Sequence, residues 1–134
     1  MPAHFLATLP NFLAYFATAI ALLAAFVAIY LYVTPYDEIA LIRANNTAAA
    51  ILLSGAVLGF ALPIANVIAH SDTLLDLAVW GVVAGIVQLL AWGAARVALP
   101  QLQEVIAAGR VAPATLVGAL SLTVGLINAA CMTY

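Results

Sequence analysis

The sequence predicts an all-α protein that crosses a membrane with four helices. Of its 134 residues, 68% are hydrophobic and 6% are charged, which is more apolar surface than one small soluble core can bury. Long uncharged runs occupy residues 12–33, 47–69, 77–95 and 111–134. Each is near or above the roughly 20 residues that a helix needs to cross a bilayer. Helices are expected because each satisfies its own backbone polar groups in lipid.

The second and fourth runs share a pattern of small residues. In the fourth run, small or polar residues recur at alternating steps of four and three. The second run has the same steps, with leucine at two of them, and a shift of 66 positions places Gly59 on Gly125. Such faces let helices approach closely in lipid. A similar row of small residues occurs in the third run. We therefore predict helix-packing seams in these three runs, formed by Ala48, Gly55, Gly59, Gly81, Ala84, Ala114, Gly118, Ser121 and Gly125.

The shared pattern predicts one membrane domain, residues 1–134, built as an internal repeat. The first two-helix unit covers residues 10–70 and the second covers residues 73–134. The very short connection between them requires the second and third helices to be antiparallel neighbours. Both units then cross the membrane in the same direction, as a parallel repeat.

The first helix is predicted to begin at Pro10, because proline is favoured at the first helical position. Thr34 and Pro35 end it. Its apolar run is too long for a signal peptide and no Lys or Arg precedes it, so we expect it to be retained. A row of alanines with the same three-four spacing predicts a packing face at Ala14, Ala17, Ala21, Ala24 and Ala28.

The links at residues 34–46 and 100–112 each predict a short helix lying on the membrane surface. Acidic residues stand near the start of each apolar stretch, where they complement the helix dipole. Glu38 and Glu104 are 66 positions apart and so extend the repeat. Two solvated acids are the simpler interpretation, and a paired carboxyl site at the mouth of the protein is the functional alternative.

Local signals predict the ends and a bend of the remaining helices. Asn45 or Asn46 is the expected N-cap of the second helix. Pro63 should kink that helix and free the carbonyl of Gly59. Thr73 with Asp76 forms a capping box at the start of the third helix, and the last helix should open at Pro113.

Three amides lie inside the predicted spans. Gln88 is the most central, and the usual role of such a side chain is a hydrogen bond to another helix, with lining of a pore as the alternative. Asn66 and Asn128 occupy matching faces of the second and fourth helices. Because an unpaired buried amide is costly, each should find a partner on a neighbouring helix or water in a cavity.

No metal or cofactor site is predicted. The residue types that bind metals and share one side of the membrane are His4, His70, Asp72, Asp76 and Cys131, and their spacing matches no metal motif. A single cysteine also cannot form a disulfide within the chain.

The three arginines predict the orientation. Arg43, Arg96 and Arg110 lie in or beside the two longer links, which places those links in the cytoplasm. Both termini are then expected outside.

Three segments resemble the YjfL-like bacterial inner-membrane family, the domain of unknown function 350. They are residues 42–50, 58–63 and 125–133. The resemblance implies a bacterial inner-membrane protein of four helices and a domain that typically occurs as a tandem pair. Asn45 stands where the family pattern has glycine. The family offers no established activity and no catalytic residue to transfer to this chain.

Three classes of function remain open. The preferred one is a non-enzymatic module that contacts lipid and assembles through its seams, as a homo-oligomeric scaffold or an accessory subunit of a membrane complex. No nucleic-acid partner is expected. An oligomeric channel or transporter is the alternative, although no carboxylate, Lys or His lies near the bilayer centre for coupling. An intramembrane enzyme is disfavoured because Cys131, Ser54 and Ser121 lack a nearby base in the sequence.

Overall fold

The computed structural model describes the backbone of residues 2–71 and 73–132 and the side chains of residues 6–71 and 73–132. In this part of the chain, the helices are α1 Pro2–Val33, α2 Glu38–Arg43, α3 Thr47–His70, α4 Leu74–Ala98, α5 Leu102–Ala107 and α6 Val111–Cys131. Four of them, α1, α3, α4 and α6, are long and apolar enough to cross a membrane. The predicted fold class is confirmed, and the internal repeat stays a prediction.

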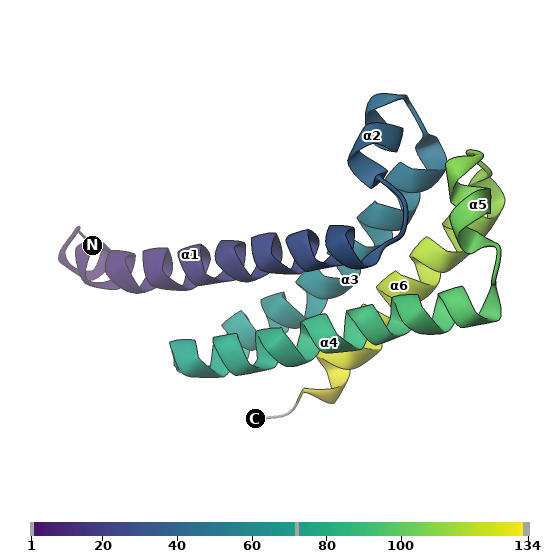
Figure 1. Cartoon of the computed structure of the whole chain (residues 1–134). Coiled ribbons are helices and arrows are strands. Elements are labelled where there is room, and N and C mark those ends of the chain that lie inside the picture. The colour runs from purple at the N-terminus through teal and green to yellow at the C-terminus, as the bar shows by residue number, and fades with distance from the viewer. Residues whose placement is uncertain (1, 72, 133–134) are drawn as a thin grey trace.

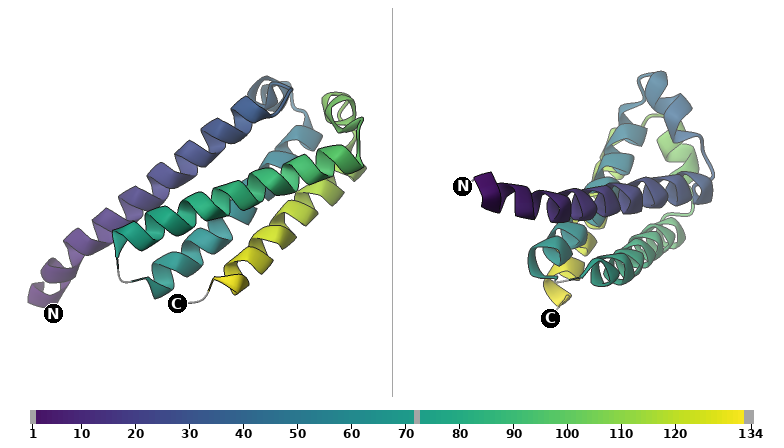
Figure 2. Two further views of the ribbon diagram at one scale, coloured as in Figure 1. Left: turned by 60° about the horizontal axis from the view of Figure 1, so that its bottom comes forward. Right: turned by 90° about the vertical axis from the view of Figure 1, so that its left-hand side faces the viewer.

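The long helices form a bundle with two distinct ends (Figure 1). The short helices α2 and α5 lie at one end, which we call the α2–α5 end. Both chain termini and the connection between α3 and α4 lie at the other, the terminal end (Figure 2). In both figures α1 lies at the edge of the bundle, and α6 follows α3 from the α2–α5 end to the terminal end.

The centre of the bundle is the close contact between α3 and α6. A Cβ atom added to Gly55 would collide with the backbone of Gly118, and one added to Gly125 would collide with the carbonyl of Gly59. Backbone therefore meets backbone, with no side chain between the helices. All nine residues of the predicted seams are buried, and the seams of α3 and α6 face each other within one chain.

Pro63 lies inside α3, which continues to His70 without interruption. Proline has no N–H for the carbonyl of Gly59, so this carbonyl is left without its helical donor. The Gly125 backbone covers it at close range, as in the Cα–H contacts to carbonyl oxygens found between closely packed helices. The kink at Pro63 stays a prediction.

Two predicted helix starts are wrong. α1 begins at Pro2 and includes Pro10, because an interior proline removes one hydrogen bond while the residues just before it, such as Leu6 and Ala7, are good helix formers. α6 begins at Val111. Pro113 then takes the third helical position, where its missing N–H costs nothing because the first four N–H groups of a helix have no intrahelical partner.

α1 is attached mainly near the α2–α5 end. Phe26 stacks on Phe60 of α3 with ring centroids 4.5 Å apart, and Tyr30 meets Trp92 of α4 edge-on at 6.4 Å. Both α1 residues are buried. The alanine row is not the face that α1 packs against within one chain, because four of its five members are exposed: Ala17, Ala21, Ala24 and Ala28. Larger side chains are needed to reach α3 and α4 from the edge of the bundle.

The two links end in the same turn. Asn45 after α2 and Gly109 after α5 have φ values of 68° and 79°, the left-handed region that glycine adopts freely and asparagine tolerates. In each turn the residue with positive φ donates its N–H to the carbonyl three residues earlier, Ile42 or Ile106. The two turns are 64 positions apart, not 66, so Glu38 corresponds in place to Leu102.

We predict that Gly59→Leu and Gly125→Leu each lower the free energy of unfolding by at least about 1–3 kcal/mol, the range for overpacked sites. A side chain added at Gly125 meets the Gly59 backbone, and one added at Gly59 meets the Ser121 carbonyl and the Gln88 amide. The matched controls are Leu58→Ala and Leu126→Ala, whose side chains are 53% and 59% exposed and should tolerate truncation. Thermal unfolding in mild detergent measures the difference, and equal stability of all four variants would contradict the glycine contact.

Candidate functional site

A cluster of buried polar groups lies where α1, α2 and α4 meet. We call it the polar corner, and its residues are Tyr30, Thr34, Tyr36, Glu38 and Trp92. Glu38 is 2% exposed, Tyr30 is 2% exposed and Thr34 is 6% exposed. Trp92 is buried and Tyr36 is half-buried. This is the place in the described chain where an ionisable carboxyl group is buried.

Several atoms of the polar corner have no hydrogen-bond partner among the described residues. These atoms are both carboxyl oxygens of Glu38, the Tyr36 hydroxyl and Trp92 Nε1. The last two lie near each other but do not meet the geometry of a hydrogen bond. The Thr34 hydroxyl lies near Glu38 but donates to the carbonyl of Leu31 at 3.2 Å. Arg96 stacks over the Trp92 ring, with its guanidinium carbon 5.5 Å from the ring centroid.

Burial changes the acidity of the two titratable groups near α2. Loss of contact with water raises the pKa of Glu38 from 4.5 to about 7, and the neighbouring charge of Asp37 acts in the same direction. Burial, followed by the charge of Glu38, raises the pKa of Tyr36. The corner can therefore hold a proton on Glu38 near neutral pH.

The alternative of a carboxyl pair formed by Glu38 and Glu104 does not fit the structure. Glu38 is buried, whereas Glu104 is exposed on α5. The reason is the spacing of the links, because the residue that takes the place of Glu38 in the second link is Leu102. The sequence predicted that Glu38 was a solvated acid or one of a pair, and missed its burial among aromatic residues.

Gln88 connects α4 to the seam between α3 and α6. It is 1% exposed, and its Nε2 donates a hydrogen bond to the Ser121 carbonyl at 3.1 Å. A Cβ atom on Gly59 would lie 2.6 Å from this nitrogen, so the glycine also makes room for the amide. The Gln88 Oε1 has no partner among the described residues. The side chain thus makes the expected hydrogen bond between helices.

The two asparagines near the terminal end differ in their bonding. Asn66 Nδ2 donates to the carbonyl of Ala129 on α6 at 2.9 Å, as expected for a bond between helices. Asn128 is half-buried, and its Nδ2 has no partner among the described residues. The predicted partner on a neighbouring helix is therefore not found for the Asn128 Nδ2 among the described residues, and the alternative of water in a cavity stays a prediction.

The helix caps are largely those that the sequence predicts. Asn46 is the N-cap of α3, and its side-chain oxygen accepts from the Ala49 N–H at 3.0 Å. Its Nδ2 donates to the Ile106 carbonyl of α5 at 2.9 Å, which ties the two links together. Thr73 caps α4 by accepting from the Asp76 N–H at 3.2 Å. The Thr73 N–H is donated to the Ser71 hydroxyl.

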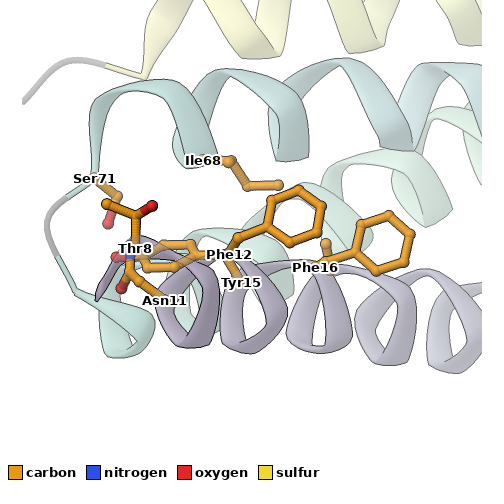
Figure 3. Close-up of a pocket in the computed structure, with 8 residues that line it drawn as sticks. Thr8, Asn11, Phe12, Tyr15, Phe16, Ile68 and Ser71 are labelled. Carbon is orange, nitrogen blue, oxygen red and sulfur yellow. The ribbon is translucent and has the colours of Figure 1, made fainter. Parts of the chain in front are cut away.

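A groove lies between α1 and α3 near the terminal end (Figure 3). Its volume is about 530 Å³. Apolar side chains such as Phe12, Phe16 and Ile68 form most of its wall, and Thr8, Asn11 and Ser71 gather at one end (Figure 3). The residues lining it include no nucleophile paired with a base.

Among the described side chains, no group of three His, Cys, Asp or Glu residues could hold a metal ion. The side chain of His4 and the whole of Asp72 lie outside the described part. Cys131 is exposed as a free thiol, and His70 Nδ1 lies 2.9 Å from the carbonyl of Asn66 on its own helix.

The model of a family described as Domain of Unknown Function (DUF350) matches residues 4–132. The chain belongs to the DUF350 family. It is 37% identical over 131 residues to the UPF0719 inner membrane protein YjfL of Escherichia coli strain K12, which covers 98% of this chain and 99% of that protein. The same values hold for the protein of that name from E. coli O157:H7. No solved structure matches the chain.

Membership of the DUF350 family confirms the resemblance drawn from the sequence. The similarity extends over nearly the whole chain, so the four apolar helices belong to an inner-membrane protein of the YjfL type. The backbone at Asn45 is left-handed, a conformation that glycine, the residue expected at this position from the resemblance, adopts without steric cost.

We predict that Asn46→Ala destabilises this DUF350 protein by about 1–2 kcal/mol, because it removes both an N-cap and the bond to α5. Asn46→Asp is the matched variant. A carboxylate can still accept from the Ala49 N–H but cannot donate to the Ile106 carbonyl, so it should lose only the bond between the links. Thermal unfolding in detergent separates the two losses, and an Asn46→Asp protein no more stable than Asn46→Ala would contradict this division.

Proposed function

We propose that this DUF350 protein is a non-enzymatic membrane module that assembles with copies of itself, as a scaffold or as an accessory subunit of a larger complex. The observation that carries the proposal is the outward-facing alanine row of α1, formed by Ala17, Ala21, Ala24 and Ala28. Rows of small residues on membrane helices are typical of helix–helix contacts.

The other small-residue seams are already used within the chain. Gly55 faces Gly118, and Gly59 faces Gly125, so these surfaces have no room for a second copy. By contrast, in the most apolar window of α1 only 6% of residues are buried, compared with 50% in α3. An edge helix with a free row of small residues supports assembly through α1, with a helix of a second copy as the partner.

The described side chains support a non-enzymatic role. Ser121 is buried in the seam, Ser54 is exposed on the apolar helix α3, and Cys131 lies at the end of α6. None of them is hydrogen-bonded to a histidine or carboxylate in the described part of the chain, as nucleophilic catalysis requires. Gln88 is engaged with Ser121 inside one copy, which removes the central amide from a pore between copies.

The proposed orientation puts the α2–α5 end in the cytoplasm. Arg43, Arg96 and Arg110 are all exposed and lie in α2, in the last turn of α4 and at the N-cap of α6. Lys and Arg are enriched in cytoplasmic links. Both termini are then outside the cell membrane, on its periplasmic face.

Assembly through α1 predicts that Ala21→Ile and Ala24→Ile lower the fraction of oligomer, because a branched side chain keeps backbones apart. The matched controls are Ile20→Ala and Ile29→Ala on the same helix, which are 49% and 50% exposed and lie off the row. Mass measurement of the intact complex in a native-like membrane gives the copy number. A monomeric wild-type protein would overturn the proposal, and cation conductance by the oligomer in bilayers would favour a channel.

The orientation predicts that Cys131, which is exposed at the terminal end, reacts with a membrane-impermeant thiol reagent added to intact spheroplasts. A Cys131→Ser protein gives the background of the measurement. Labelling that occurs only after the cytoplasmic side is opened would show that the orientation is inverted.

A further inference from the structure

Glu38 and Leu102 hold the same place in the two links. Each is the first residue of a six-residue helix, each is 2% exposed, and each precedes the same left-handed turn. A leucine fills this place in one link, so the fold does not need a carboxyl group there for packing. A carboxyl group in the other link is costly, because burying an ionised group without a partner is strongly unfavourable.

Glu38 forms no ion pair with the residues that the structure describes. α1 contributes the Tyr30 hydroxyl and the link contributes the Tyr36 hydroxyl, which are uncharged groups near Glu38, and the charge of Asp37 disfavours a negative charge on Glu38. α4 contributes Trp92 and Arg96, whose guanidinium is stacked on the indole ring. α3 has no titratable group before His70, at its far end, and Arg43 is exposed at the far end of α2.

We propose that Glu38 is a proton-binding site, and that the bound proton keeps the polar corner closed. Both carboxyl oxygens of Glu38 are buried and accept no hydrogen bond from the described residues, which a neutral carboxyl group tolerates far better than a carboxylate does. The ligand of the site is the proton itself. This inference does not depend on assembly through α1.

Release of the proton leaves a negative charge that must be solvated. α2 has only six residues and is joined to the bundle by a short link on each side, so it is easily displaced. Water then reaches Glu38 most readily if α2 and the end of α1 move away from α4. Such opening acts directly on the contact between Tyr30 and Trp92, which attaches α1. Proton binding on the α2–α5 side is thereby coupled to the position of α1.

The sign of the pH effect follows from the raised pKa. The folded protein keeps a proton on Glu38 that the unfolded chain loses between pH 4.5 and about 7. Its stability should therefore fall as pH rises through this window and level off above it. Glu38→Gln and Glu38→Leu should both remove this dependence, and Glu38→Leu copies the residue that the second link already tolerates.

The test uses the full chain in lipid nanodiscs in a Trp80→Phe background, where Trp92 is the remaining tryptophan. Trp92 emission and its quenching by a water-soluble quencher are measured against pH. We expect quenching to increase with a midpoint near pH 7, and to be independent of pH in Glu38→Gln and Glu38→Leu. Glu104→Gln, which removes an exposed carboxyl group, should keep the transition.

Infrared spectroscopy provides a second measurement that does not require the Glu38 variants to fold. The carbonyl stretch of a protonated carboxyl group should be present in the wild type below its midpoint, disappear as pH rises, and persist in Glu104→Gln. The proposal is overturned if this band is absent from the wild type at every pH below the midpoint, or if Glu104→Gln removes the band. It is also overturned if a folded Glu38→Gln protein keeps the pH-dependent change in Trp92 fluorescence.

Discussion

The direct contact between the backbones of α3 and α6 is the constraint on which the rest of the structure depends. In lipid no hydrophobic effect drives one helix toward another, so close packing and polar contacts must hold the bundle together. Glycines at positions 55, 59, 118 and 125 allow this approach. The same contact covers the carbonyl that Pro63 leaves without a donor, and Gln88 of α4 reaches the Ser121 carbonyl beside it. One seam therefore organises three of the four long helices.

The fourth long helix, α1, is held by a different kind of contact. α1 is held by aromatic side chains near the α2–α5 end, where Phe26 and Tyr30 meet Phe60 and Trp92. At the opposite, terminal end, a groove lies between α1 and α3. An edge helix anchored at one end is the element of this bundle whose position is most easily changed, and the polar corner lies at its anchor. The buried acid and the exposed alanine row are thus features of the same helix and its link.

The buried polar groups divide according to their place in the bundle. Gln88 and Asn66 donate to carbonyls of α6 across the seam, and Asn46 joins α3 to α5. These amides replace the water that lipid cannot supply. Glu38, Tyr36 and Trp92 instead bury polar atoms that have no such partner. That contrast distinguishes groups that stabilise the fold from a group whose presence the packing does not explain.

The sequence alone determined the membrane class, the four spans, the small-residue seams and most caps, because these depend on composition and on spacing along one helix. It also identified the family, through three short segments that are each continuous in sequence. The tertiary structure decided which faces are used. It placed the α1 alanines on the outside of the bundle, because aromatic side chains make the contacts of α1 with α3 and α4. It also showed that Glu38 and Leu102 occupy equivalent positions, because the two links superpose at a shift of 64 positions and not 66. Spacing along a helix cannot show which neighbour covers a face, and the burial of Glu38 depends on how α2 packs against the long helices.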